Sequence, residues 1–427
     1  IGMVHQHFML ARPLTVVENV MLGRKSRRGI LLDTKETARE LQTLSDKYGM
    51  GVDPYSKIWQ LSVGEQQRVE ILTALYMGAD ILLLDEPTAV LTPQETNLFF
   101  DTLRQMRDDG KSIVLITHKL EEIIAIVDEV TVLRDGKMIG TLNMDESVTK
   151  DQLTRMMVGR DVLFNFKENT RAPGAVRYCL KNLCARHALG VAKNFSLDIR
   201  EGEIVGLAGV DGNGQSELCE VLTGLRPLDA GEITLDDEKM ANRPPAYFIS
   251  HGVSHIPEDR HTTGLAMNWD LELNLILKCF YKAPFAKHGL LCKKAIEEYW
   301  EKTRAAYQIK ANCGGDTARS LSGGNQQKVI LAREIESEPK VLIANQPTRG
   351  LDVGAAEYVR QKLLNTRGNG AALLVVSADL EELLQLSDRI AVIYGGELMG
   401  ILERGADPYQ IGELMMGKKQ EVSVCEA

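Results

Sequence analysis

The sequence predicts an α/β fold that is built twice, as two copies of one domain, each with a mixed, largely parallel sheet core and an inserted helical subdomain. Three observations predict it. Similar segments recur at a fixed distance of 260 residues. Short apolar runs rich in β-branched residues alternate with amphipathic helical patterns, which is typical of a parallel sheet. A charged amphipathic helix is expected before a Leu-Ser motif in each copy, at 34–49 and at 293–308.

The repeat is the strongest of these observations. LSVGEQQRVEIL near the middle of the first copy matches LSGGNQQKVILA in the second, and three further segments align at the same distance. The aligned pairs are Leu61 with Leu321, Asp85 with Asn345, His118 with Ala378, and Val130 with Ile390. A period this long excludes a solenoid of short repeats and indicates a duplicated domain.

The repeat also sets the expected domain boundaries. We expect the first domain at 1–160, a polar linker at 161–176, the second domain at 177–418 and a short tail at 419–427. Glu258 matches Gln6 across the repeat, yet it lies roughly 80 residues after the second copy begins. We therefore expect the first copy to lack a comparable stretch at its start, including a phosphate-binding loop.

Composition excludes several classes of protein. Apolar residues make up 44% and charged residues 26%, as in ordinary globular proteins. The net charge of −9 argues against a basic nucleic-acid binder. No apolar run approaches 18 residues, so we expect no membrane crossing. The seven cysteines include no CxxC pair, which argues against a disulfide framework and a zinc site.

A glycine-rich loop, GVDGNGQS, follows the expected strand EIVGLA and opens the expected helix SELCEVLTGL. Backbone N–H groups of such a loop can surround phosphate oxygens at a helix start. The nucleotide-binding candidates are Gly209, Gly212, Gly214, Gln215 and Ser216. Ser216 is placed to ligate Mg²⁺, whereas Gln215 stands where such loops carry lysine. Taken alone, the loop is weak evidence for a nucleotide, and the alternative is a tight turn that packs a helix against a strand.

The two Leu-Ser motifs precede helices. In the second copy Ser322 suits an N-cap, and Gly323 and Gly324 leave the helix start open to a ligand. A simple capped helix is the alternative. Each motif, however, begins 24 residues before a strand-end residue, Asp85 or Asn345. This repeated spacing favours a ligand site.

Two acids end an apolar run in the first copy. The run ILLLDE predicts a strand buried on both faces. At its carboxyl end, Asp85 could hold Mg²⁺ through water and Glu86 could polarise an attacking water. His118 closes the next strand, SIVLITH, so parallel pairing would place it beside Glu86. Gln6 is the fourth polar candidate, and it is weak evidence by itself.

On these motifs the sequence resembles the ATP-binding subunit of an ABC importer with tandem ATPase domains, most closely the simple-sugar and nucleoside branch. The resemblance covers 1–418 and is carried by HQHF, LSVGEQQR, LDEPTAVLTPQE, ITHK, GVDGNGQSE, PEDR, LSGGNQQK and QPTRGLDVGA. It implies two P-loop NTPase (ABC ATPase) domains that face head to tail, with ATP and Mg²⁺ as cofactors.

The resemblance also implies partners. They are two integral-membrane permease subunits and, indirectly, an extracytoplasmic solute-binding protein, with no nucleic acid. The subunit would lie peripherally on the cytoplasmic face of the cell membrane. The resemblance leaves open which solute is carried, which residue stacks on adenine and what the oligomeric state is.

In the geometry of such families, each nucleotide lies between one domain's P-loop and the other domain's signature motif. The first site would use Gln6, Asp85, Glu86 and His118, completed by Ser322, Gly323 and Gly324. The second would use Gly209–Ser216, Glu258, Asn345, Gln346 and Ala378, completed by Ser62 and Gly64, between which Val63 replaces a glycine.

All the losses of charged or imidazole groups fall in the second set, where Gln215, Asn345, Gln346 and Ala378 replace Lys, Asp, Glu and His. We expect the first site to hydrolyse ATP and the second to hold it weakly or statically. The chain as given is expected to have little activity alone.

Two alternatives are a soluble tandem ABC protein that acts on ribosomes and a non-catalytic ATP-binding scaffold. The short linker and the altered second site count against the first, and Glu86 with His118 against the second.

Overall fold

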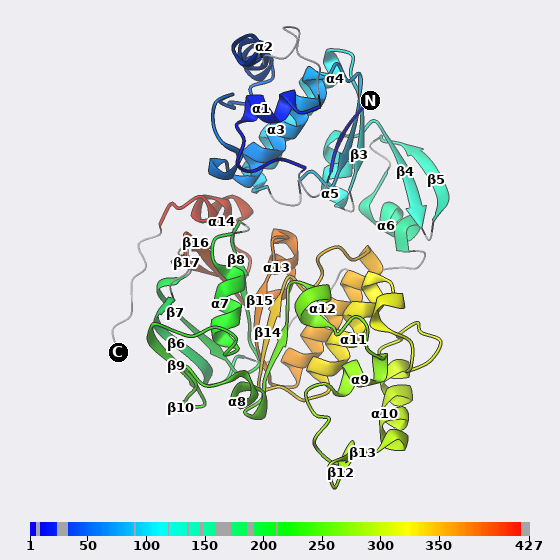
Figure 1. Cartoon of the computed structure of the whole chain (residues 1–427), viewed down its shortest axis with the longest axis vertical. Helices are drawn as coiled ribbons and strands as arrows, with labels where there is room; N and C mark the ends of the chain where they lie inside the picture. Colours follow the sequence, from blue (N-terminus) through cyan, green and yellow to red (C-terminus); the bar gives the residue numbers. More distant parts are fainter. Residues whose placement is uncertain are drawn as a thin grey trace. The chain divides into compact units, whose positions relative to one another are not determined.

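The computed structural model divides the chain into two compact units, Ile1–Val162 and Leu163–Ala427 (Figure 1). It describes residues 1–5, 9–23, 33–88, 91–117, 119–134, 136–145, 148–158, 172–185, 192–210 and 212–419. Gln6, His118, most of the expected linker and all but one residue of the expected tail lie outside these ranges. The domain boundaries expected from the repeat stay predictions.

The first unit has helices on a small parallel sheet of order β1-β2-β3, with β4 and β5 as a separate antiparallel pair. Leu82 and Leu84 of β2 pack on the helices α3 and α4. The elements are β1 (Gly2–Val4), α1 (Val16–Met21), α2 (Thr34–Lys47), α3 (Val63–Tyr76), β2 (Ile81–Asp85), α4 (Pro93–Asp108), β3 (Ser112–Ile116), α5 (Leu120–Ile126), β4 (Glu129–Arg134), β5 (Lys137–Asn143) and α6 (Lys150–Val158).

The expectation that β2 is buried on both faces is wrong. Leu82 and Leu84 are fully buried, whereas Ile81 is exposed and Leu83 is only half-buried. The helices cover one face of the strand. The matching strand of the second unit, β14 (Val341–Asn345), also packs on an antiparallel sheet and a helix, which have no counterpart among the described residues of the first unit. Apolar composition indicates what a strand can bury, but the neighbouring layer decides what it does bury.

The second unit has a six-stranded sheet of order β11-β14-β15-β8-β16-β17, which is parallel except for the last pair. A four-stranded antiparallel sheet has the order β10-β9-β6-β7. The strands are β6 (Val176–Ala185), β7 (Ala192–Arg200), β8 (Ile204–Ala208), β9 (Ala230–Leu235), β10 (Glu238–Lys239), β11 (Val253–Ile256), β12 (Ala286–Lys287), β13 (Leu290–Leu291), β14 (Val341–Asn345), β15 (Ala372–Val376), β16 (Arg389–Tyr394) and β17 (Glu397–Glu403).

The helices of the second unit are α7 (Gln215–Leu222), α8 (Pro245–Ser250), α9 (Leu271–Ile276), α10 (Lys293–Ala306), α11 (Gly323–Ile335), α12 (Val353–Gly368), α13 (Leu380–Leu386) and α14 (Pro408–Met415). Val341 and Ile343 of β14 pack toward the antiparallel sheet and α7, whereas Leu342 and Ala344 pack toward α11 and α12. Figure 1 shows these two layers on opposite sides of the six-stranded sheet. All residues of β8, β14 and β15 are buried.

These elements confirm the predicted α/β class with a largely parallel sheet and an inserted helical part. The two charged helices expected before the Leu-Ser motifs are α2 and α10. In the second unit the inserted part is held by a small apolar cluster of Ile276, Phe285 and Ile296. Among the described helices, none combines the length and the apolar character that crossing a membrane requires.

Candidate functional sites

The glycine-rich loop of the second unit joins the central strand β8 to α7. β8 is hydrogen-bonded to β15 on one side and to β16 on the other. Gly212 and Gly214 have φ angles of +88° and +101°, in the left-handed region that favours glycine. Gly214 is the residue directly before α7. The chain therefore turns sharply, with N–H groups at the start of a helix, which is the arrangement that binds phosphate.

The side chain of Gln215 hydrogen-bonds to the backbone of the same loop. It is buried, with Nε2 donating to the carbonyl oxygen of Val210 at 3.0 Å and Oε1 accepting from the N–H of Asn213 at 3.1 Å. Gly209 leaves room for the amide, because a Cβ there would lie 2.6 Å from Nε2. The amide provides no positive charge, so a phosphate in this loop would depend on backbone N–H groups and the helix start.

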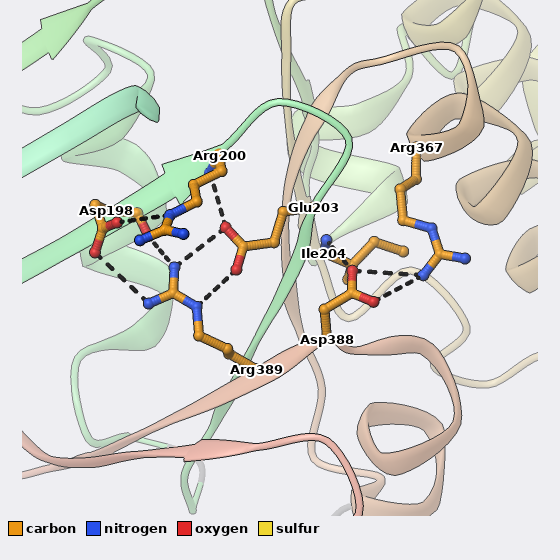
Figure 2. Close-up of polar contacts among 7 residues, drawn as sticks. All are labelled: Asp198, Arg200, Glu203, Ile204, Arg367, Asp388 and Arg389. Carbon is orange, nitrogen blue, oxygen red and sulfur yellow. Dashed lines mark hydrogen bonds and ion pairs between the residues drawn. The ribbon is translucent and has the colours of Figure 1, made fainter. Parts of the chain in front are cut away.

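Ion pairs fix the opposite end of β8, as Figure 2 shows. The N–H of Ile204 donates to Asp388 at 2.9 Å, and Arg367 donates to both oxygens of the same carboxylate at 3.2 and 3.4 Å. Arg389 makes two hydrogen bonds to Glu203, at 2.6 and 3.1 Å. These contacts tie the strand that carries the loop to the first residues of β16 and the end of α12.

A polar group lies beside the first turn of α7. The hydroxyl of Ser216 donates to Oε2 of Glu258, and Nδ2 of Asn345 donates to the same hydroxyl at 3.2 Å. Arg349 forms an ion pair with the other oxygen of Glu258. The sequence singled out Ser216 and missed Arg349. The available signal was a basic residue four positions after the strand-end Asn345, where the first copy has Ala89.

This group fits Mg²⁺, the metal implied by the resemblance. The side chain of Asn345 is 3% exposed, and its Oδ1 has no hydrogen-bond partner. Hydroxyl, carboxylate and amide oxygens are the ligands that Mg²⁺ takes. Among the described residues there is no cluster of three or more His, Cys, Asp or Glu side chains that could hold a metal. A cation here would therefore depend on mixed oxygen ligands with one carboxylate.

The strand-end residues of the two units have the same backbone and different side chains. Glu86 and Gln346 have φ angles of +46° and +50°. The N–H of each donates to the neighbouring strand, to Ile116 at 2.9 Å and to Val376 at 2.8 Å. A non-glycine residue with positive φ is uncommon, and such residues cluster at functional sites. The turn has been kept while a carboxylate has been exchanged for an amide.

The side chain of Gln346 is already engaged, because its Oε1 accepts from the N–H of Ala378 at 3.1 Å. Ala378 matches His118 across the repeat. In the second unit, the position that matches His118 thus lies within hydrogen-bond reach of the position that matches Glu86. Gln6 and His118 themselves lie outside the described residues.

A buried glutamate supports each strand-end turn from behind. Glu122 accepts from Thr88 and from Thr117, the latter at 2.8 Å. In the second unit Glu382 accepts from the matching hydroxyls, Thr348 at 2.9 Å and Ser377 at 2.7 Å. Burial raises the pKa of Glu382. Both turns are therefore held by the same contacts.

The two Leu-Ser motifs differ in their caps. Ser62 accepts from the N–H of Glu65 at 3.3 Å and donates its own N–H to Oε2 of Glu65 at 2.7 Å, a complete capping box. The hydroxyl of Ser322 instead accepts from the side-chain amide of Asn325, at 2.9 Å, and makes no hydrogen bond to the N–H groups of α11. The α11 start therefore lacks the cap that closes the α3 start.

The glycines of the two Leu-Ser motifs lie close to side chains of other elements. A Cβ at Gly64 would lie 3.2 Å from the side chain of Glu95, and one at Gly324 would lie 3.3 Å from Ala355. A Cβ at Gly323 would lie 3.7 Å from the guanidinium of Arg260, whose pKa is lowered by burial. Arg260 is a second basic residue that the sequence left without a role. It is the last residue of the PEDR motif.

Ser216, Glu258 and Asn345 thus lie together in the second unit, and Asp85 and Glu86 lie together at the end of β2 in the first. Cys219 of α7 is fully buried, and burial raises the pKa of its thiol, which fits a packing role. The roles assigned to all these residues stay predictions.

Comparison with known proteins gives a family match and several similar relatives. The sequence profile of the family described as "ABC transporter" matches residues 1–89 and 192–349. The nucleoside import ATP-binding protein NupA of Lactococcus lactis is 45% identical over 98% of this chain and 83% of its own length. The guanosine import ATP-binding protein NupO of Bacillus subtilis is 45% identical over 99% of this chain and 83% of its own length.

The glucose import ATP-binding protein TsgD13 of Haloferax volcanii is 44% identical over 98% of this chain and 82% of its own length. Among solved structures, the ATP-binding subunit of an ABC transporter is 19% identical, with a TM-score of 0.48, over 56% of this chain and 99% of its own length.

Proposed function

This chain belongs to the ABC transporter family, and from that premise we propose that it is the ATP-binding subunit of an importer for a nucleoside or a simple sugar. One observation carries the proposal. Relatives that are 44–45% identical along almost the whole chain are named as import ATP-binding proteins for nucleosides, guanosine and glucose. The ATP-binding proteins of this family are ATPases, so the reaction is ATP hydrolysis coupled to uptake.

The proposed assembly follows from that role. The chain binds ATP with Mg²⁺, works with two integral-membrane permease subunits and lies against the cytoplasmic face of the membrane. A solute-binding protein delivers the solute to the permease and acts on this subunit only indirectly. The names of the relatives support the importer, and the oxygen ligands beside α7 support Mg²⁺.

We further propose that the two copies divide the work. In the first, Asp85 orients Mg²⁺ through water, while Glu86 takes a proton from the attacking water and His118 senses the phosphate being transferred. In the second, an amide replaces Glu86, and its oxygen is engaged with Ala378. A general base contributes about 10²- to 10⁴-fold to such a reaction. The second copy would then bind nucleotide without cleaving it at a useful rate.

The test of the importer is uptake. We expect cells without this gene to lose uptake of labelled guanosine, glucose or a related nucleoside or sugar, and to regain it with the gene on a plasmid. The tagged protein should co-purify with two hydrophobic membrane proteins. Unchanged uptake, with co-purification of ribosomes instead, would show that the ribosome-acting alternative is right.

A further inference from the structure

The polar group beside α7 contains an exchange that the loss of catalytic groups does not explain. Across the repeat, Glu258 matches Gln6 and Asn345 matches Asp85. Each copy therefore has one carboxylate and one amide at this pair of positions, with the two groups exchanged. If the second site had only lost its catalytic groups, the carboxylate at the position of Asp85 would be missing, and no new carboxylate would be expected at the position of Gln6.

The fold places the exchanged groups next to each other. Glu258 follows β11, Asn345 ends β14, and these strands are parallel neighbours, with Ile256 paired to Ala344. The second copy thus has no carboxylate at Asn345, but it has one at Glu258, just beyond the end of the neighbouring strand. Both residues contact the hydroxyl of Ser216, each through a hydrogen bond.

Asn345 provides the second, independent observation. Its side chain is almost fully buried, and its Oδ1 has no hydrogen-bond partner. A buried acceptor without a partner is costly, and native proteins leave few of them without a water or an ion. The other end of the same carboxamide, Nδ2, is turned to Ser216. The group therefore contains an unused oxygen as well as a hydroxyl and a carboxylate.

We propose that the second copy holds a divalent cation together with the phosphates of a bound nucleotide, and that Glu258 supplies the negative charge that Asn345 cannot. This rests on the proposed nucleotide binding by the loop 209–216. Ser216 and Glu258 contribute oxygen ligands, and Asn345 contributes a neutral one. Mg²⁺ is usually held by one or two carboxylates with substrate phosphates and water, which this set satisfies.

Arg349 sets the orientation of the carboxylate. It pairs with Oε1 of Glu258, which leaves Oε2 for the side of Ser216. The first copy has Ala89 at the position of Arg349. Because the arginine and the cation share one carboxylate, the cation is held with moderate strength. The second copy thus retains a metal-bound nucleotide, while the side chain of Gln346 provides no base to cleave it.

The experiment measures the binding of a fluorescent ADP analogue to this chain, with excess Mg²⁺ and with EDTA. We expect Mg²⁺ to tighten binding to the wild-type chain. Glu258→Gln should weaken binding in Mg²⁺ about tenfold and leave binding in EDTA unchanged, since a charged contact is lost only when the cation is present. Electron paramagnetic resonance with Mn²⁺ at equal ADP saturation should show less bound Mn²⁺ for this variant.

The double variant Glu258→Gln/Asn345→Asp is the matched control, because it restores the first copy's arrangement. It should recover the Mg²⁺ dependence, which also rules out misfolding as the cause of the single variant's loss. Equal effects of Mg²⁺ on the wild type and on Glu258→Gln would overturn this inference and leave nucleotide binding intact. No binding of the ADP analogue in either condition would overturn both this inference and the proposed nucleotide binding.

Discussion

The elements of the first unit match part of the second unit, whereas β8, α7 and the four-stranded antiparallel sheet of the second unit have no counterpart among the described residues of the first. The order β1-β2-β3 in the first unit matches β11-β14-β15 in the second, and the pair β4-β5 matches β16-β17, including the same irregularity after Val132 and Val392. In the second unit β8 lies between β15 and β16 and joins the two groups into one sheet. Among the described residues of the first unit, no strand joins β3 to β4.

That difference changes the environment of matching residues. Val114 and Ile116 of β3 are 48% and 51% exposed, whereas the matching Leu374 and Val376 of β15 are 0% and 1% exposed. Leu374 and Val376 belong to an apolar cluster with the antiparallel sheet and α7, and β8 pairs with β15 along its edge. The two elements that flank the glycine-rich loop, β8 and α7, therefore also contribute to the burial of β15.

The largest expected effect concerns the strand ends. Glu86→Gln should lower ATP hydrolysis by about 10²- to 10⁴-fold, because it removes the proposed general base of the first copy. The measurement is the ATPase rate of the whole gene product assembled with its membrane subunits in proteoliposomes. The matched variant Gln346→Glu should leave the rate nearly unchanged, since Ala378 stands where the first copy has a histidine. A rate that survives Glu86→Gln would contradict the division of work.

The second comparison uses an ion pair that both copies contain. Arg367 with Asp388 and Arg107 with Asp128 match across the repeat. The carboxylate side chain is 18% exposed in Asp388 and 81% exposed in Asp128. Removing one partner of a buried pair costs about 3–5 kcal/mol, whereas an exposed pair contributes about 0–1 kcal/mol.

We expect Asp388→Ala to lower the free energy of unfolding of the second unit by about 3 kcal/mol, because Arg367 and the N–H of Ile204 lose their acceptor (Figure 2). Hydrogen exchange of the β8 amides measures it directly. Asp128→Ala is the control and should cost less than about 1 kcal/mol. Similar losses in the two variants would show that burial does not separate the two pairs.

The sequence predicted the fold well because the repeat and the alternation of strands and helices can be recognised from residue patterns within short segments. It placed the loop between β8 and α7 and the acids at the end of β2 for the same reason. It was wrong about the second face of β2, because the covering layer is not encoded in the strand itself. It also missed Arg349, which pairs with Glu258, and Arg260, whose guanidinium lies beside Gly323, because spacing alone does not give these neighbours.

The third prediction concerns the glycine-rich loop at 209–216. Gln215→Lys should tighten binding of an ADP analogue to this chain by about 10- to 100-fold, since a charged hydrogen bond is worth about 1.5–3 kcal/mol. Isothermal titration calorimetry gives the affinity. Gln215→Met is the control, because it also removes the bonds to Val210 and Asn213 without adding charge. Equal affinities for the two variants would show that loop closure, and not charge, limits binding.

The smallest expected effect separates the two Leu-Ser motifs. Ser62→Ala should lower the free energy of unfolding of the first unit by about 1 kcal/mol, because it removes the cap of α3. Ser322→Ala should cost the second unit less, since the hydroxyl of Ser322 accepts from Asn325 and not from the helix backbone. Urea denaturation of each variant, followed by hydrogen exchange in α3 and α11, makes the comparison. A larger loss for Ser322→Ala would mean that this serine serves stability, whereas a smaller one leaves the start of α11 available for a nucleotide phosphate.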